Sequence, residues 1–114
     1  MAKSYYTTQE KAHIHDTTMP LLEAMYSEFK ELSKKKPDSA VSKSKIKITN
    51  RLLEKVRKVL EDTTSIEFLD LLDEDDVPQV SDVTLILSQY VASMKAFYEK
   101  YYGWDGATHD WFIK

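Results

Sequence analysis

Apolar residues recur every three or four positions along three long stretches of this chain, which is the spacing of an amphipathic helix. The pattern predicts helices over residues 18–33, 42–62 and 82–102. In the first two stretches the apolar stripes consist of Leu21, Leu22, Met25, Tyr26, Phe29 and Leu32, and of Ile46, Thr49, Leu53, Val56 and Leu60, widened by Ile48, Leu52 and Val59. The third stripe is the most regular, and we expect Tyr90 and Met94 at its middle to be its most buried positions.

A short fourth helix is predicted over residues 65–72, because Thr64 and Glu67 have the spacing of a capping box. The last helix is expected to be capped by Ser81 or Asp82, and Gly103 stands where a helix-ending glycine is common. The residues before position 18 form either a separate short helix or an extension kinked at Pro20.

The last residues of the chain are too apolar for a free tail, since they include Trp104, Trp111 and Phe112. We expect them to fold back on the helices, with Asp105 and Gly106 in the turn. The resulting fold class is all-α: a single domain over residues 1–114, built as a small bundle of about four helices. The bundle has an N-terminal extension and an aromatic C-terminal tail packed on it.

Composition agrees with a small globular domain, at 114 residues with 42% hydrophobic and 31% charged residues. The absence of cysteine excludes disulfides and thiolate metal sites. No apolar run reaches the roughly 18 residues of a membrane span, and the N-terminus lacks the apolar segment of a secretory signal. We therefore expect a cytoplasmic protein with no membrane partner.

Charge is strongly segregated along the chain. Residues 30–58 contain eleven lysines and arginines against three acids, whereas residues 59–82 contain nine acids and no base. Five of the basic residues follow one another at three- or four-residue spacing on one helix face, and we call them the basic row: Lys43, Lys47, Arg51, Lys55 and Lys58. Such a face is typical of a docking surface for an anion. Alternatively, the acidic segment 61–76 neutralises it within the fold.

The favoured function is a small cytosolic accessory or regulatory protein, non-catalytic, that binds a protein partner through the basic row. Tyr102, on the polar side of the last helix, is a further candidate contact residue. A nucleic-acid-binding module using the same face is one alternative, although the pI of 5.6 is far below the value above about 9 that is typical of such domains. In the favoured interpretation the acidic stretch is either a second binding surface or the site of self-association into a homo-oligomer.

Two patterns point to metal chemistry. Glu28-x-x-Glu31 and Glu67-x-x-Asp70 loosely resemble the paired carboxylates of all-α nucleoside triphosphate pyrophosphohydrolases, and the resemblance implies a Mg²⁺-dependent enzyme as an alternative function. In addition, imidazoles of His13, His15 and His109 could bind a transition metal if the two ends of the chain met. Asp16 and Asp110 directly follow two of these histidines. Because Glu31 faces away from the apolar stripe, we expect no catalytic residue among these carboxylates. We also expect no metal and no cofactor, since histidines in a helix-start region and in a tail are more often ordinary surface or boundary residues.

Overall fold

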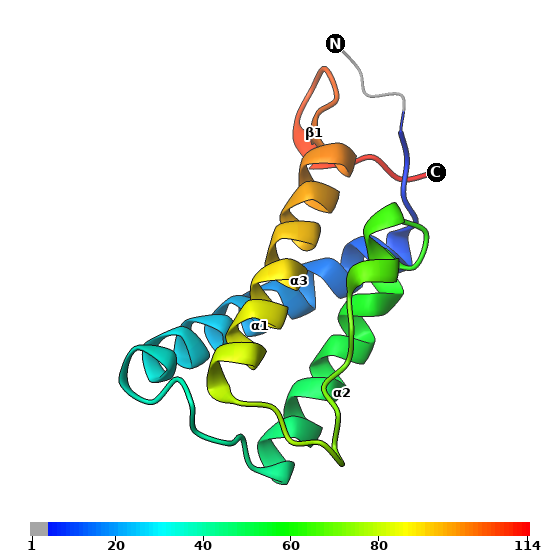
Figure 1. Ribbon diagram of the computed structural model, residues 1–114. Helices are drawn as coiled ribbons and strands as arrows, with labels where there is room; N and C mark the ends of the chain where they lie inside the picture. The colour runs from blue at the N-terminus through cyan, green and yellow to red at the C-terminus, as the bar shows by residue number, and fades with distance from the viewer. Residues whose placement is uncertain (1–4) are drawn as a thin grey trace.

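Three α-helices carry most of the chain: α1 (Gln9–Lys35), α2 (Lys43–Leu60) and α3 (Val80–Tyr101). The computed structural model describes residues 5–114, and its extents are 49 × 24 × 20 Å. In Figure 1, α3 crosses in front of α1, and α2 lies beside them. The all-α expectation is therefore broadly confirmed, but three α-helices are present in the described residues where about four were predicted.

The first helix is longer than the predicted range 18–33. Thr8 caps it, accepting a hydrogen bond from the Lys11 backbone N–H at 3.2 Å. The helix continues through Pro20, although a proline has no N–H to donate to the carbonyl four residues earlier. Residues 9–17 are thus an extension of the first helix and not a separate one, whereas residues 1–4 lie outside the described part.

The predicted fourth helix over residues 65–72 is instead a 3-10 helix, η1 (Thr64–Phe68). Its cap position is Thr63, which makes no side-chain capping bond, so the predicted capping box at Thr64 is wrong. Leu69 and Leu72 are buried, whereas Phe68 is 70% exposed.

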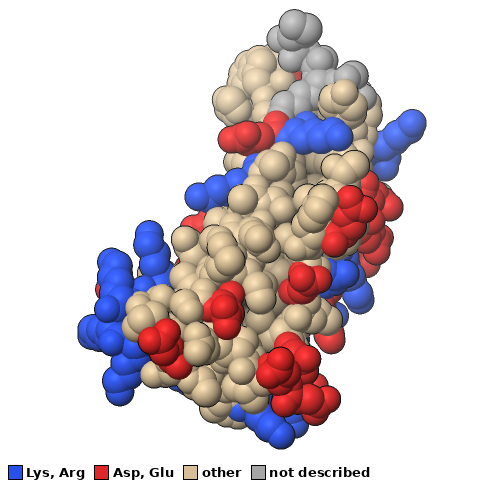
Figure 2. All heavy atoms as spheres, in the orientation of Figure 1, with Lys and Arg blue, Asp and Glu red and all other residues tan. Residues whose placement is uncertain are grey.

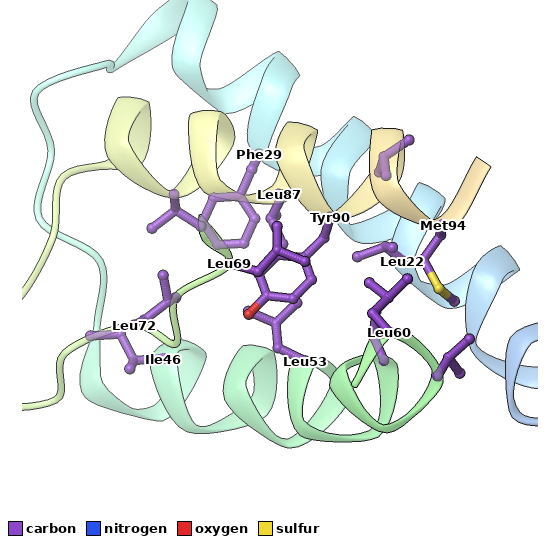
Figure 3. Close-up of a cluster of buried hydrophobic side chains, with 14 of the residues drawn as sticks. Leu22, Phe29, Ile46, Leu53, Leu60, Leu69, Leu72, Leu87, Tyr90 and Met94 are labelled. Carbon is purple, nitrogen blue, oxygen red and sulfur yellow. The ribbon is translucent and has the colours of Figure 1, made fainter. Parts of the chain in front are cut away.

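The segment after η1 runs beside α2 and closes the side of the bundle between α2 and α3. The Asn50 amide donates to the Leu72 carbonyl at 2.9 Å, and its oxygen accepts from the Leu72 N–H at 2.8 Å. Arg57 donates to the Leu69 carbonyl. Figure 3 shows Leu69 and Leu72 directed into the space between the two helices.

The centre of the core lies on α3, as the apolar spacing predicted. Tyr90 and Met94 are fully buried, and in Figure 3 the Tyr90 ring lies between α3 and α2, close to Leu53 and Leu69. The cap of α3 differs from the prediction. The helix begins after Gln79, whose backbone N–H donates to the Asp82 carboxylate at 3.1 Å, so Asp82 lies in the first turn.

The C-terminal residues form a small antiparallel hairpin of β1 (Tyr102–Trp104) and β2 (His109–Trp111). Gly103 directly follows Tyr102, the C-cap residue of α3, as predicted, but it pairs with Asp110 in the hairpin and does not have the positive φ of a left-handed cap. The expected turn is present: Gly106 has φ 105°, and Asp105 accepts hydrogen bonds from the N–H groups of Ala107 and Thr108, each at 2.9 Å.

Packing of this tail is confirmed in part. Phe112 is buried and Trp111 is partly buried, but Trp104 is 50% exposed. The two ends of the described chain meet, because the Thr7 N–H donates to the Phe112 carbonyl at 2.9 Å and the Lys114 N–H donates to the Thr7 carbonyl at 3.1 Å.

Candidate functional site

The basic row lies along the outer face of α2. Ser42 caps this helix, accepting from the Lys45 N–H at 3.3 Å, which sets the helical phase of the residues that follow. The side facing the core is filled by Ile46, Thr49, Leu53, Val56 and Leu60, all of them buried. All five members of the basic row are exposed. The row is thus a continuous positive strip on the surface.

The acidic segment does not pair with this strip. Within residues 5–114 the salt bridges join Lys11 to Glu61 at 3.5 Å and to Asp62, and Lys34 to Glu31 at 3.1 Å. None of them includes a member of the basic row. The hydrogen bond that Lys11 donates to the Asp62 carboxylate is the largest cause that raises the pKa of Lys11, so the two acids that follow α2 compensate a lysine of α1.

Among the remaining acids of the segment, Asp73 stabilises its own loop. The Asp73 carboxylate accepts from the backbone N–H groups of Asp76 at 3.1 Å and Asp75 at 2.8 Å, and these two bonds lower its pKa. Figure 2 shows acidic side chains over the end of α2 and over the segment before α3, while basic ones gather at the far end of α1.

An open apolar groove adjoins the basic row between α1 and α2. Its volume is 670 Å³, and Arg51 and Lys55 belong to its lining. Two apolar residues that were expected in the core, Leu21 and Ile48, line it and are 56% and 52% exposed. The prediction that both would be covered is wrong, because in the described residues no element of the chain packs over this side of the two helices.

Tyr102 belongs to the hairpin and does not line this groove. Its ring stacks on Tyr98 with centroids 4.5 Å apart and meets Trp111 edge-on at 5.5 Å. Its hydroxyl donates to the His109 carbonyl at 3.3 Å. Its predicted role as a contact residue stays a prediction.

The four carboxylates of the enzyme alternative are distributed over different parts of the molecule. Glu28 lines the groove, Glu31 pairs with Lys34, Glu67 lies in η1 and Asp70 in the segment after it. No group of three or more His, Cys, Asp or Glu side chains able to hold a metal ion occurs in residues 5–114.

The histidines have separate surroundings, although the ends of the chain do meet. His15 is 3% exposed, and its Nε2–H donates to the Met94 carbonyl at 2.8 Å. Its ring stacks on Phe97 at 5.8 Å and meets Trp111 at 5.0 Å. His13 is exposed, and His109 lies against Trp104 at 5.2 Å.

The candidate site therefore consists of the basic row and the apolar groove along its edge. The row could be predicted from residue spacing, whereas the groove could not, because the apolar spacing of Leu21 and Ile48 is the same as that of core residues.

None of the helices in the described part of the chain has both the length and the apolar composition to cross a membrane. Comparisons of this chain with protein-family models, with curated proteins and with solved structures found no match.

Proposed function

We propose that this chain is a small, non-catalytic accessory or regulatory protein that binds an acidic segment of a partner protein through the basic row of α2. One observation carries the proposal: the row is exposed and has no acidic partner within residues 5–114. Like charges at this spacing repel one another on a helix unless an anion compensates them. Carboxylates of a partner supply that compensation.

A protein partner suits the surroundings of the row better than a nucleic acid does. The net charge is −3, so the potential over much of the remaining surface opposes a long polyanion. Leu21 and Ile48 add exposed apolar area next to the row, which suits protein side chains and not a phosphate backbone. The proposal includes a cytoplasmic location, with which the lack of cysteine agrees.

The test is charge reversal within the row by Lys47→Glu/Lys55→Glu. A partner captured by the natural chain is identified by mass spectrometry, purified and titrated against this variant. A matched control, Lys35→Glu/Lys36→Glu, makes the same change in net charge at the end of α1. We expect the row variant to bind at least about 10-fold more weakly, since charge pairs at interfaces contribute strongly to affinity, and the control to bind like the natural chain.

Two results would count against the proposal. Equal affinity of the natural chain and the row variant would show that the row is not the contact surface. Capture that disappears after nuclease treatment, with affinity for an oligonucleotide that falls steeply with salt, would favour the nucleic-acid alternative. For an acidic protein partner, binding should weaken moderately as salt screens the row.

A further inference from the structure

The three helices leave one side of the bundle uncovered. Between α2 and α3, the segment after η1 supplies Leu69 and Leu72 to the core, held there by Asn50 and Arg57. Between α1 and α2 no such segment lies within the described residues, and the groove occupies that place. In a helical bundle, the position over two neighbouring helices is where a fourth helix packs.

The groove has an apolar floor that follows both helices. Its apolar lining comprises Ile14, Leu21, Ala24, Met25, Ile48 and Leu52. A second hollow of 250 Å³ continues it towards Leu32 and shares Met25, Glu28 and Ile48 with the first. From Lys45 to Lys55 the α2 side is about 15 Å long, which matches a helix of about three turns.

The edge of the groove is positive. Arg51 and Lys55 of the basic row line the main part, and Lys45 lines its continuation. Glu28 is the one carboxylate among the described residues that line either part. An occupant therefore needs apolar side chains for the floor and acidic side chains along the edge that faces α2.

We infer that the groove binds an amphipathic helix of the partner, with apolar residues at i, i+3 or i+4 and i+7 on the floor and Asp or Glu residues facing Arg51 and Lys55. The inference rests on the proposed function, because the basic row determines the acidic edge. Helix-in-groove binding is a common mode of peptide recognition. A peptide that binds by adding a β-strand would need a sheet edge, and the strands of the described residues form only the C-terminal hairpin.

The experiment selects binders from a displayed library of helical 14-residue peptides and titrates them by NMR against the full natural chain. Leu21→Gln/Ile48→Gln removes the exposed apolar side chains but keeps good helix-forming residues. Leu85→Gln is the matched control, since Leu85 lies on α3 outside the groove and is 62% exposed. We expect the selected peptides to be acidic and amphipathic, and their largest NMR chemical-shift changes to centre on Leu21 and Ile48. The groove variant should bind them about 10-fold more weakly, and the control should bind them as tightly as the natural chain does.

The outcomes separate the two proposals. Acidic peptides that bind the groove variant normally but lose affinity for Lys47→Glu/Lys55→Glu would overturn the groove inference and leave the proposed function standing. Acidic peptides that bind that row variant as tightly as the natural chain would contradict both. Selection of basic or non-periodic peptides would overturn the inference. So would a natural chain that sediments as a dimer and becomes monomeric in the groove variant, because the occupant would then be a second copy.

Discussion

The Tyr90 side chain joins three parts of the core. Its hydroxyl donates to the Asp70 carbonyl at 2.9 Å and lies 3.4 Å from Arg57 Nη1. Arg57 also donates to the Leu69 carbonyl, so α2, α3 and the segment after η1 are tied together at one point. Burial raises the pKa of Tyr90, because a phenolate there would lose its hydration, while Arg57 opposes the effect less strongly.

Tyr90→Phe should therefore reduce the loss of stability in alkali. The folded-state pKa lies above the ordinary value of 10.0, so the folded chain keeps a proton that the unfolded chain releases. The contribution is complete below about pH 10 and disappears as the pH rises through the folded pKa. At neutral pH the variant should lose about 0.5–1.5 kcal/mol with the hydrogen bond.

The measurement is the difference in unfolding free energy between the natural chain and Tyr90→Phe, from urea titrations between about pH 8 and pH 11. Lys11 and Tyr98 also have raised pKa values, but both remain in the variant and cancel in the difference. Identical pH slopes for the two chains would contradict the assignment to Tyr90.

For single residues, helical spacing predicted burial correctly where another part of the chain packs over the residue. It failed where no other part does. Tyr90 and Met94 were expected in the core and are there. Leu21 and Ile48 have equally good helical spacing but are exposed. Periodicity identifies an apolar face, whereas its cover depends on the number of other elements and on their positions.

Among the elements, the segment after η1 depends most on one side chain. Asn50 makes two hydrogen bonds with the backbone of Leu72, as donor and as acceptor. An extended segment beside a helix has no regular backbone hydrogen bonds to that helix. The two bonds from the Asn50 amide supply partners for the Leu72 backbone, as a neighbouring strand would in a sheet.

Asn50→Ala should destabilise the fold by about 1–3 kcal/mol, because the partly buried N–H and carbonyl of Leu72 lose their partners. Hydrogen exchange should show that protection falls first in residues 69–72. Unchanged exchange of this segment in Asn50→Ala would show that Leu69 and Leu72 hold it in place without the amide.

The α-helices were predictable and the shorter elements were not. The predicted ranges 42–62 and 82–102 agree within two residues with α2 (Lys43–Leu60) and α3 (Val80–Tyr101). They agree because a long apolar stripe is a strong signal of a helix. The strands of the hairpin contain three residues each, too few for an alternating pattern. Their pairing depends on contacts with distant residues, such as the bond from Trp111 Nε1 to the Asp16 carboxylate at 3.2 Å.

At the scale of the whole molecule, the packing of the two chain ends predicts that the two tryptophans differ in their exposure to solvent. Trp104 is half exposed, whereas Trp111 is partly buried and its ring packs against those of His15, Phe97 and Tyr98. In Trp104→Phe, the fluorescence of Trp111 should resist acrylamide, and in Trp111→Phe, that of Trp104 should be readily quenched. Equal quenching of the two would contradict the packing of the hairpin.

The charge distribution of the molecule motivates the central claim, that the basic row serves a partner and not the fold. Within residues 5–114 Glu61 and Asp62 pair with Lys11, and the Asp73 carboxylate accepts hydrogen bonds from its own loop; none of the salt bridges joins an acid to the row. Four neighbouring pairs of the row are like-charged: Lys43 with Lys47, Lys47 with Arg51, Arg51 with Lys55, and Lys55 with Lys58.

The most direct test is the unfolding free energy of Lys47→Glu/Lys55→Glu relative to the natural chain, measured in urea at low salt. The substitutions convert all four like-charged pairs into opposite pairs. If the fold does not use the row, stability should stay the same or rise by up to about 1 kcal/mol in total, and salt should remove the gain. If the acidic segment does compensate the row internally, the variant will be less stable than the natural chain, and that result would contradict the central claim.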